Sequence, residues 1–79
     1  MIKINKIQTL DDHKIYFIFS DNTEKVIDFK QFIKSDKFTR QLSDPEYFKL
    51  VKIYENGRGI YWPNEYDFCP DFLRKFADK

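Results

Sequence analysis

The chain has little of what usually staples a small protein or places it in a membrane. It holds one cysteine among 79 residues, so no disulfide can form within it, and hydrophobic packing is the evident source of stability. It has no run of about 18 apolar residues, and polar side chains interrupt its first six residues. We therefore expect a soluble protein of the reducing cytoplasm, without a membrane span or a signal peptide.

An excess of charge of one sign is also missing. Lys and Arg number 14 against 13 Asp and Glu, and the two signs are interleaved along the chain, which is not the pattern of a nucleic-acid or membrane-surface binder. The single histidine, His13, has no neighbour at metal-ligand spacing and is expected to be an exposed turn residue. No glycine-rich phosphate loop, zinc motif or nucleophile elbow occurs. The sequence thus predicts no metal, no cofactor and no enzymatic activity.

Aromatic residues are abundant by contrast. Nine phenylalanines, five tyrosines and one tryptophan can each bury roughly 150–250 Å², which suits one small domain spanning residues 1–79. Apolar residues that alternate or are β-branched predict strands at 2–9, 14–20 and 24–28, joined by polar turns into an antiparallel meander. Asn56-Gly57 predicts a type I′ hairpin between strands at 51–54 and 60–62, and Gly59 indicates a bulge or a longer loop there. About five strands are expected.

Helix signals lie between and after these strands. Phe29 and Phe32 have the spacing of one helical face, so a short helix or turn is predicted there, whereas 38–42 is predicted to be irregular. Asp44 followed by Pro45 is typical of a helix start. A closing helix at 70–77 would place Phe72, Leu73 and Phe76 on one face. The fold class predicted is α+β, with the C-terminal helix packed on the sheet.

Several short motifs resemble a known family. Phe19-Ser20-Asp21, Leu42-Ser43-Asp44-Pro45 and the run from Trp62 to Leu73 are similar to the short bacterial family called domain of unknown function 2442, and the likeness covers nearly the whole chain. The motif residues are Asp28, Asp44, Pro45, Trp62, Pro63, Asn64, Asp67, Cys69, Pro70 and Asp71.

The resemblance implies a small α+β protein without an assigned activity. Some members are fused to helix-turn-helix segments, and some are encoded beside another small protein in a toxin–antitoxin-like arrangement. The chain departs from the family at Asn22 and Glu65, where a glycine often stands, and these departures concern loop shape.

The motif residues have both chemical and structural interpretations. Cys69 before a helix start could be a nucleophile, but no base is near it in sequence, so a small buried residue is the preferred reading. Glu65, Asp67 and Asp71 could hold a cation, but caps are commoner. Asp28 could be an unpaired buried acid, but we expect it to accept N–H bonds from the turn that follows. These residues are interpreted as structural.

A binding module is the function class that remains. Strand 14–20 is apolar on both faces, so Tyr16 and Ile18 are predicted to lie on a partly uncovered face that contacts a protein partner, either a co-encoded small protein or a second copy. Tyr54, Arg58 and Tyr61 in the hairpin are the other candidate interaction residues. The alternative is a small nucleic-acid-binding or transcription-regulatory domain. Its stacking platform and surrounding cations would be Tyr16, Tyr54, Tyr61 and Trp62 with Lys14, Lys25, Lys52 and Arg58.

Overall fold

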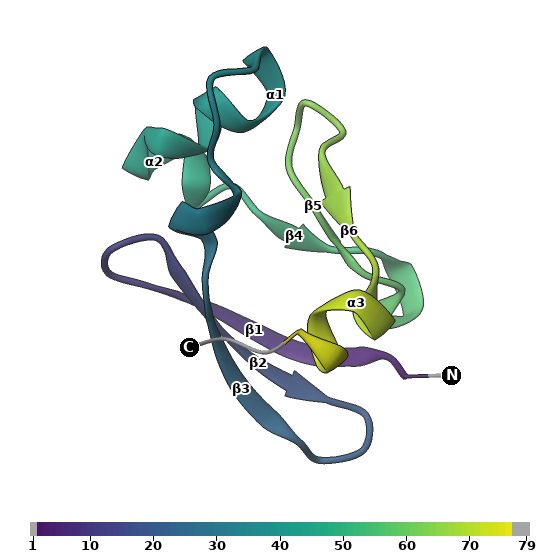
Figure 1. Cartoon of the computed structure of the whole chain (residues 1–79). Helices are drawn as coiled ribbons and strands as arrows, with labels where there is room; N and C mark the ends of the chain where they lie inside the picture. Colours follow the sequence, from purple (N-terminus) through teal and green to yellow (C-terminus); the bar gives the residue numbers. More distant parts are fainter. Residues whose placement is uncertain (1, 77–79) are drawn as a thin grey trace.

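An antiparallel meander forms one side of the molecule in a computed structural model that describes residues 2–76 (Figure 1). Its strands are β1 (Ile4–Leu10), β2 (Lys14–Phe19) and β3 (Glu24–Asp28), in the order β1-β2-β3. Alternation of apolar side chains explains β2, because Ile15, Phe17 and Phe19 are all 0% exposed. The predicted meander is confirmed, with β1 beginning two residues later than expected.

A second three-stranded sheet lies across the core from the meander. It consists of β4 (Lys52–Ile53), β5 (Ile60–Tyr61) and β6 (Asp67–Phe68), in the order β4-β5-β6. The α+β class is confirmed, but the expected count of about five strands is wrong, because six strands form two sheets of three. Strand β6 was missed because two residues are too few to show an alternation.

Short helical segments link the two sheets. They are η1 (Phe29–Phe32), α1 (Lys37–Arg40), η2 (Gln41–Ser43) and α2 (Pro45–Phe48), where η denotes a 3-10 helix. The turn at Phe29 and the helix beginning at Pro45 agree with the prediction. The segment 38–42, expected to be irregular, is helical in α1 and η2 instead. Asp36 stabilises the start of α1, because its Oδ1 accepts the Thr39 N–H at 2.9 Å.

Both glycines in the β4–β5 connection are required by close backbone approach. Gly57 has φ +71° and a Cβ there would lie 2.5 Å from the Ile4 carbonyl oxygen. Gly59 has φ +139° and a Cβ there would lie 2.4 Å from the Phe68 carbonyl oxygen. The hairpin is confirmed, with the longer loop that Gly59 indicated in place of a two-residue type I′ turn, because η3 (Glu55–Gly57) occupies it. Gly57 thus allows this loop to pass close to the first strand of the meander.

The core between the sheets is aromatic. Trp62 and Phe29 are both 0% exposed, and their ring centroids lie 5.9 Å apart. Phe48 from α2 and Phe68 from β6 complete the group, with centroids 5.7 and 6.1 Å from that of Trp62. The indole Nε1 donates a 2.9 Å hydrogen bond to the Phe48 carbonyl, so the buried ring keeps a polar partner.

Helix α3 (Pro70–Lys75) closes the described chain and is shorter than the predicted 70–77, whose last residue lies outside the described residues. Leu73 is fully buried as expected, but Phe72 is 44% exposed. Lys25 of β3 donates to the Leu73 and Arg74 carbonyls at 3.2 and 3.1 Å, and to that of Phe76. A cation at the helix C-terminus satisfies unpaired carbonyls and complements the helix dipole. The meander therefore holds α3 in place.

Candidate interaction surface

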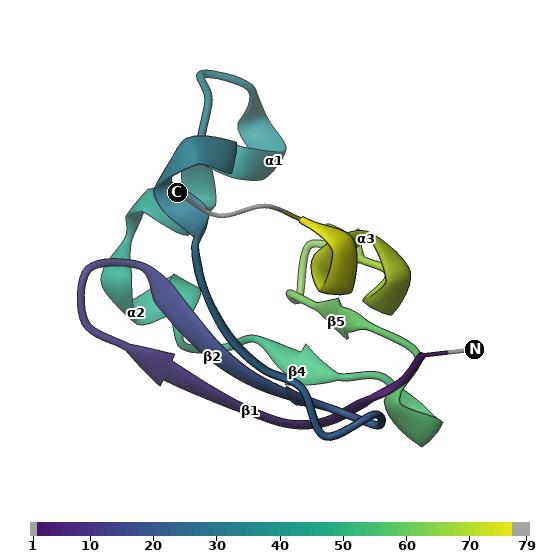
Figure 2. The ribbon, with the colours of Figure 1, turned by 60° about the horizontal axis from the view of Figure 1, so that its bottom comes forward.

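The meander has one face that no other described element covers. Figures 1 and 2 both show the second sheet, α1, α2 and α3 on the same side of β1–β2–β3. Strand register assigns the side chains of the opposite side, here called the outer face, in three cross-strand rows. The rows are Lys6, Ile18 and Glu24; Gln8, Tyr16 and Val26; and Leu10, Lys14 and Asp28.

The centre of the outer face is apolar and incompletely buried. Tyr16 and Ile18 are half-buried, while Val26 is 41% exposed and Leu10 36% exposed. Tyr16 and Val26 are direct cross-strand partners, which lie about 5 Å apart in a sheet. Ile18 is two residues along β2 from Tyr16, and Leu10 lies diagonally across from Tyr16 on β1. The sequence prediction that Tyr16 and Ile18 share an uncovered face therefore matches their position in the structure.

Charges of both signs border this apolar centre. Glu24 lies on β3 and Lys6 on β1, and Ile18 of β2 lies between them in the same row. The Tyr16 hydroxyl donates a 2.7 Å hydrogen bond to Glu24 Oε1, which holds the carboxylate over the face. A tyrosine hydroxyl is already protonated at neutral pH, and this bond raises the pKa of Tyr16 further above its ordinary value of 10.0.

The other three candidate interaction residues lie in β5 and the β4–β5 loop, apart from the outer face. Tyr54 and Tyr61 stack with ring centroids 4.5 Å apart, and the Tyr54 hydroxyl donates to Asp67 Oδ2 at 2.8 Å. Arg58 lines a hollow of about 520 Å³ with Tyr54, Glu55 and Asn56. The tyrosines thus hold the β4–β5 loop against β6. In the hollow, Glu55 offsets the positive charge of Arg58.

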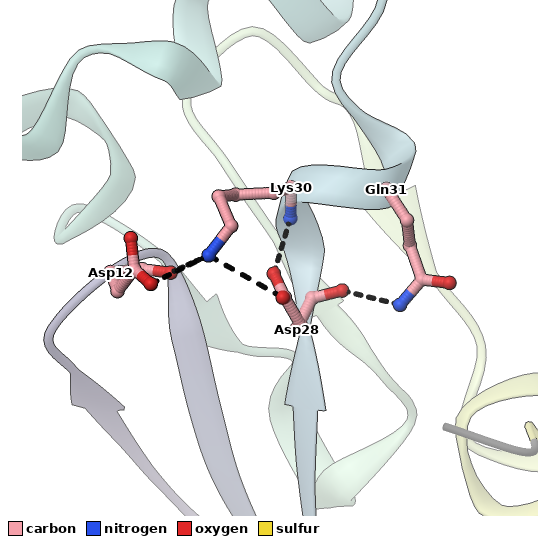
Figure 3. Close-up of polar contacts among 4 residues, drawn as sticks. All are labelled: Asp12, Asp28, Lys30 and Gln31. Carbon is pink, nitrogen blue, oxygen red and sulfur yellow. Dashed lines mark hydrogen bonds and ion pairs between the residues drawn. The ribbon is translucent and has the colours of Figure 1, made fainter. Parts of the chain in front are cut away.

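Two of the motif aspartates cap short helices. Asp28 Oδ1 accepts the Lys30 N–H at 2.9 Å, and its Oδ2 lies 3.4 Å from Lys30 Nζ, which reaches on to Asp12 Oδ2 at 2.7 Å (Figure 3). The expectation for Asp28 is therefore confirmed. Asp44 Oδ1 accepts the Glu46 N–H at 3.0 Å and Pro45 takes the first helical position. These motif residues stabilise helix starts.

Asn64 and Pro63 shape the β5–β6 turn, directly after Trp62. The Asn64 side-chain oxygen accepts the Tyr66 N–H at 3.1 Å, and its backbone N–H donates to the Tyr47 hydroxyl at 2.9 Å. Trp62 and Tyr66 pair across a three-residue loop. The motif therefore joins this turn to α2 and to the core.

The two residues at which this chain departs from the family pattern, Asn22 and Glu65, occupy equivalent positions in two such loops. Asn22 closes the three-residue loop between Phe19 and Thr23, and Glu65 closes the one between Trp62 and Tyr66. Both have positive φ, +69° and +71°. A left-handed residue ends this loop type, which explains why glycine suits the position. The loop shape is kept in this chain although the side chain differs.

Cys69 lies at the start of α3 but is exposed, so the expectation of a buried cysteine is wrong. It is the N-cap residue, and its side chain makes no capping hydrogen bond, while Pro70 is buried and Asp71 lies in the first turn as expected. These three residues and Arg58 line a hollow of about 340 Å³. Burial of the proline ring explains the motif better than burial of the thiol.

His13 is more enclosed than the sequence indicated. Its ring lies edge-on to Phe48 with centroids 5.0 Å apart, and Nε2 is 3.1 Å from the Ser43 carbonyl oxygen. It therefore connects the β1–β2 turn to η2 and α2. Within residues 2–76, no group of three or more His, Cys, Asp or Glu side chains is placed to hold a metal ion. No helix in the same range is long and apolar enough to cross a membrane.

Sequence reasoning missed two further features. Lys25 was named only as one of the cations around the alternative stacking platform, yet it caps α3 from the inner side of the meander. Its place on β3 gave no signal of that distant partner. A row of partly exposed aromatic rings runs from η1 to α3, with successive centroids 5.1 to 5.9 Å apart. Its members are Phe32, Phe68, Phe72 and Phe76.

These features define a small α+β domain of two three-stranded sheets, in which the motif residues build caps, turns and core. The chain belongs to the family described as protein of unknown function, DUF2442, whose model matches residues 4–78. This match confirms the resemblance seen in the sequence. No curated protein and no solved structure gives a significant match.

Proposed function

We propose that this chain is a small non-enzymatic protein-interaction domain that binds its partner through the outer face. The supporting observation is the apolar centre of that face, where Tyr16, Ile18 and Val26 lie together without a covering layer. A contiguous apolar area ringed by polar side chains is typical of a protein-binding surface. Through the family resemblance, the partner proposed is a small protein encoded beside this one, with this chain as the antitoxin-like or accessory member.

Charge balance favours a protein partner over a nucleic acid. On the outer face, Lys6 and Lys14 are matched by Glu24 and Asp28. Binding to phosphates needs a concentration of positive charge, and its affinity falls steeply with salt. Binding to DNA or RNA that is tight and resists salt in a gel-shift titration would contradict the proposal.

Co-purification of the native complex tests the proposed function. The tagged chain is expressed with its neighbouring gene, and Ile18→Lys and Tyr16→Glu are compared with the wild type. We expect both variants to fold and to lose the partner, since each places a charge in the apolar centre. Leu50→Lys is the matched control, because Leu50 is 49% exposed and lies outside the outer face. Retention of the partner by all three variants would contradict the proposal.

A further inference from the structure

The outer face has an arrangement of charge that is complementary to itself. Lys6 and Glu24 lie at opposite ends of one cross-strand row, with Ile18 between them. Two strand spacings separate their backbones, about 10 Å. Tyr16 holds the Glu24 carboxylate over the face, so a negative group is fixed on the β3 side and a positive one on the β1 side.

We propose that a second copy of this chain binds to the outer face, with a twofold axis parallel to β2. Rotation about that axis places β1 of one copy over β3 of the other and keeps each row opposite itself. Lys6 then lies opposite Glu24 of the second copy, twice, and Ile18 faces Ile18. Aligned face-to-face packing of this kind is the usual geometry of two sheets, at a separation of about 10 Å.

The other twofold axis in the plane of the face is disfavoured by charge. An axis perpendicular to the strands would place Glu24 opposite Asp28 of the second copy, twice, and Ile18 opposite Lys14. Like charges that face each other destabilise an interface. In the favoured arrangement the one like-charged contact is Lys14 with Lys14, against two such contacts for the other axis.

The size of the face sets the expected affinity. Three strands of five residues give a footprint of about 14 by 17 Å per copy, well below the roughly 800 Å² per partner of a standard interface. A weak dimer is therefore expected, with a dissociation constant of about 0.1–1 mM. Such a contact would form at high local concentration and give way to a tighter partner.

Charge exchange tests this register. Lys6→Glu and Glu24→Lys should each raise the dissociation constant by about tenfold, because each replaces two attractive pairs with two repulsive ones. The double variant should return to within about threefold of the wild type, since it restores both pairs with their signs exchanged. Lys52→Glu is the control for Lys6→Glu, because it changes the net charge by the same amount at an exposed residue of β4.

Sedimentation equilibrium up to about 2 mM supplies the constants, and circular dichroism checks each fold. Recovery of association in the double variant alone supports the proposed dimer. A wild type that stays monomeric throughout, or a double variant as weak as the single ones, overturns it. Because the dimer uses the outer face, it rests on the proposed function. Loss of the co-encoded partner in Ile18→Lys, together with a monomeric wild type, would overturn only the dimer.

Discussion

The two sheets differ in how they are held. The meander has strands of seven, six and five residues, and alternating side chains give it one buried and one open face. The second sheet has three strands of two residues each, which cannot stabilise a sheet by their ladders alone. Glycines, an Asn64 turn and the Trp62 core hold it instead. Length and alternation therefore form the first sheet, and specific loop residues form the second.

This difference bears on where binding can occur. The meander keeps its shape through many backbone pairs, so its outer face can change side chains without loss of the fold. In the second sheet, Gly57, Gly59 and Asn64 each fill a role in a loop that a neighbouring residue cannot take over. Substitutions on the outer face of the first sheet should thus be tolerated, whereas substitutions of the glycines and turn residues of the second sheet should be poorly tolerated.

Truncation of the buried face of β2 should have the largest effect. Phe17→Ala removes a ring that is 0% exposed and should lower the free energy of unfolding by about 3–5 kcal/mol. Its neighbour Ile18 points outward, so Ile18→Lys should cost less than about 1 kcal/mol. Urea denaturation of both variants compares the two faces. Equal losses would show that the outer face is part of the core.

Gly57→Ala should disturb the close approach of the β4–β5 loop to the meander. The added Cβ would meet the Ile4 carbonyl oxygen at 2.5 Å, and the backbone at φ +71° is unfavourable for alanine. We expect a loss of about 2–4 kcal/mol. Arg58→Ala, at the next and exposed position, is the control and should cost less than about 0.5 kcal/mol. Thermal unfolding measures both.

The two equivalent hairpin loops allow a smaller and matched test. Glu65→Gly should stabilise the protein by up to about 1 kcal/mol, because it relieves a left-handed conformation that glutamate adopts poorly. Asn22→Gly should change stability by less than about 0.5 kcal/mol, since asparagine tolerates that region. A greater gain from Asn22→Gly than from Glu65→Gly in the same denaturation assay would contradict this explanation.

Acid should weaken the turns of the meander slightly. A hydrogen bond from Lys30 lowers the pKa of Asp12 below its ordinary value of 3.8. Hydrogen bonding by Thr23, and then by Arg74, lowers that of Asp21. A carboxyl group whose pKa is lower in the folded than in the unfolded protein stabilises the fold at pH values above its unfolded pKa. This stabilisation is lost as the pH falls through its folded pKa. Unfolding measured from pH 5 to pH 2 should show this loss, and Asp12→Asn should make it smaller.

The sequence predicted the meander to within two residues, because alternating apolar positions at Ile15, Phe17 and Phe19 carry the strand signal themselves. It did not predict β6 or the division into two sheets, since two-residue strands depend on tertiary packing. Exposure of Cys69 and Phe72 could not be inferred either, because a helix of six residues can rotate to suit the core beneath it.

The candidate surface was predictable only in part. Alternation placed Tyr16 and Ile18 on the same face. The alignment of Lys6 with Glu24 depends on strand register, which is regular from the Leu10–Lys14 pair to the Lys6–Ile18 pair and becomes irregular only between Lys6 and Ile4. The complementary placement of Lys6 and Glu24 therefore follows from the pairing of the strands and could not be predicted from the sequence.

Chemical-shift mapping by NMR tests the central claim most directly. Spectra of the isotope-labelled chain are recorded while unlabelled chain is added to about 2 mM, and then with the co-encoded protein. We predict that in both titrations the shifts concentrate on β1, β2 and β3, with the largest at Tyr16, Ile18 and Val26. Shifts confined to the second sheet or to the aromatic row around Phe72 would contradict the assignment of the outer face as the binding surface.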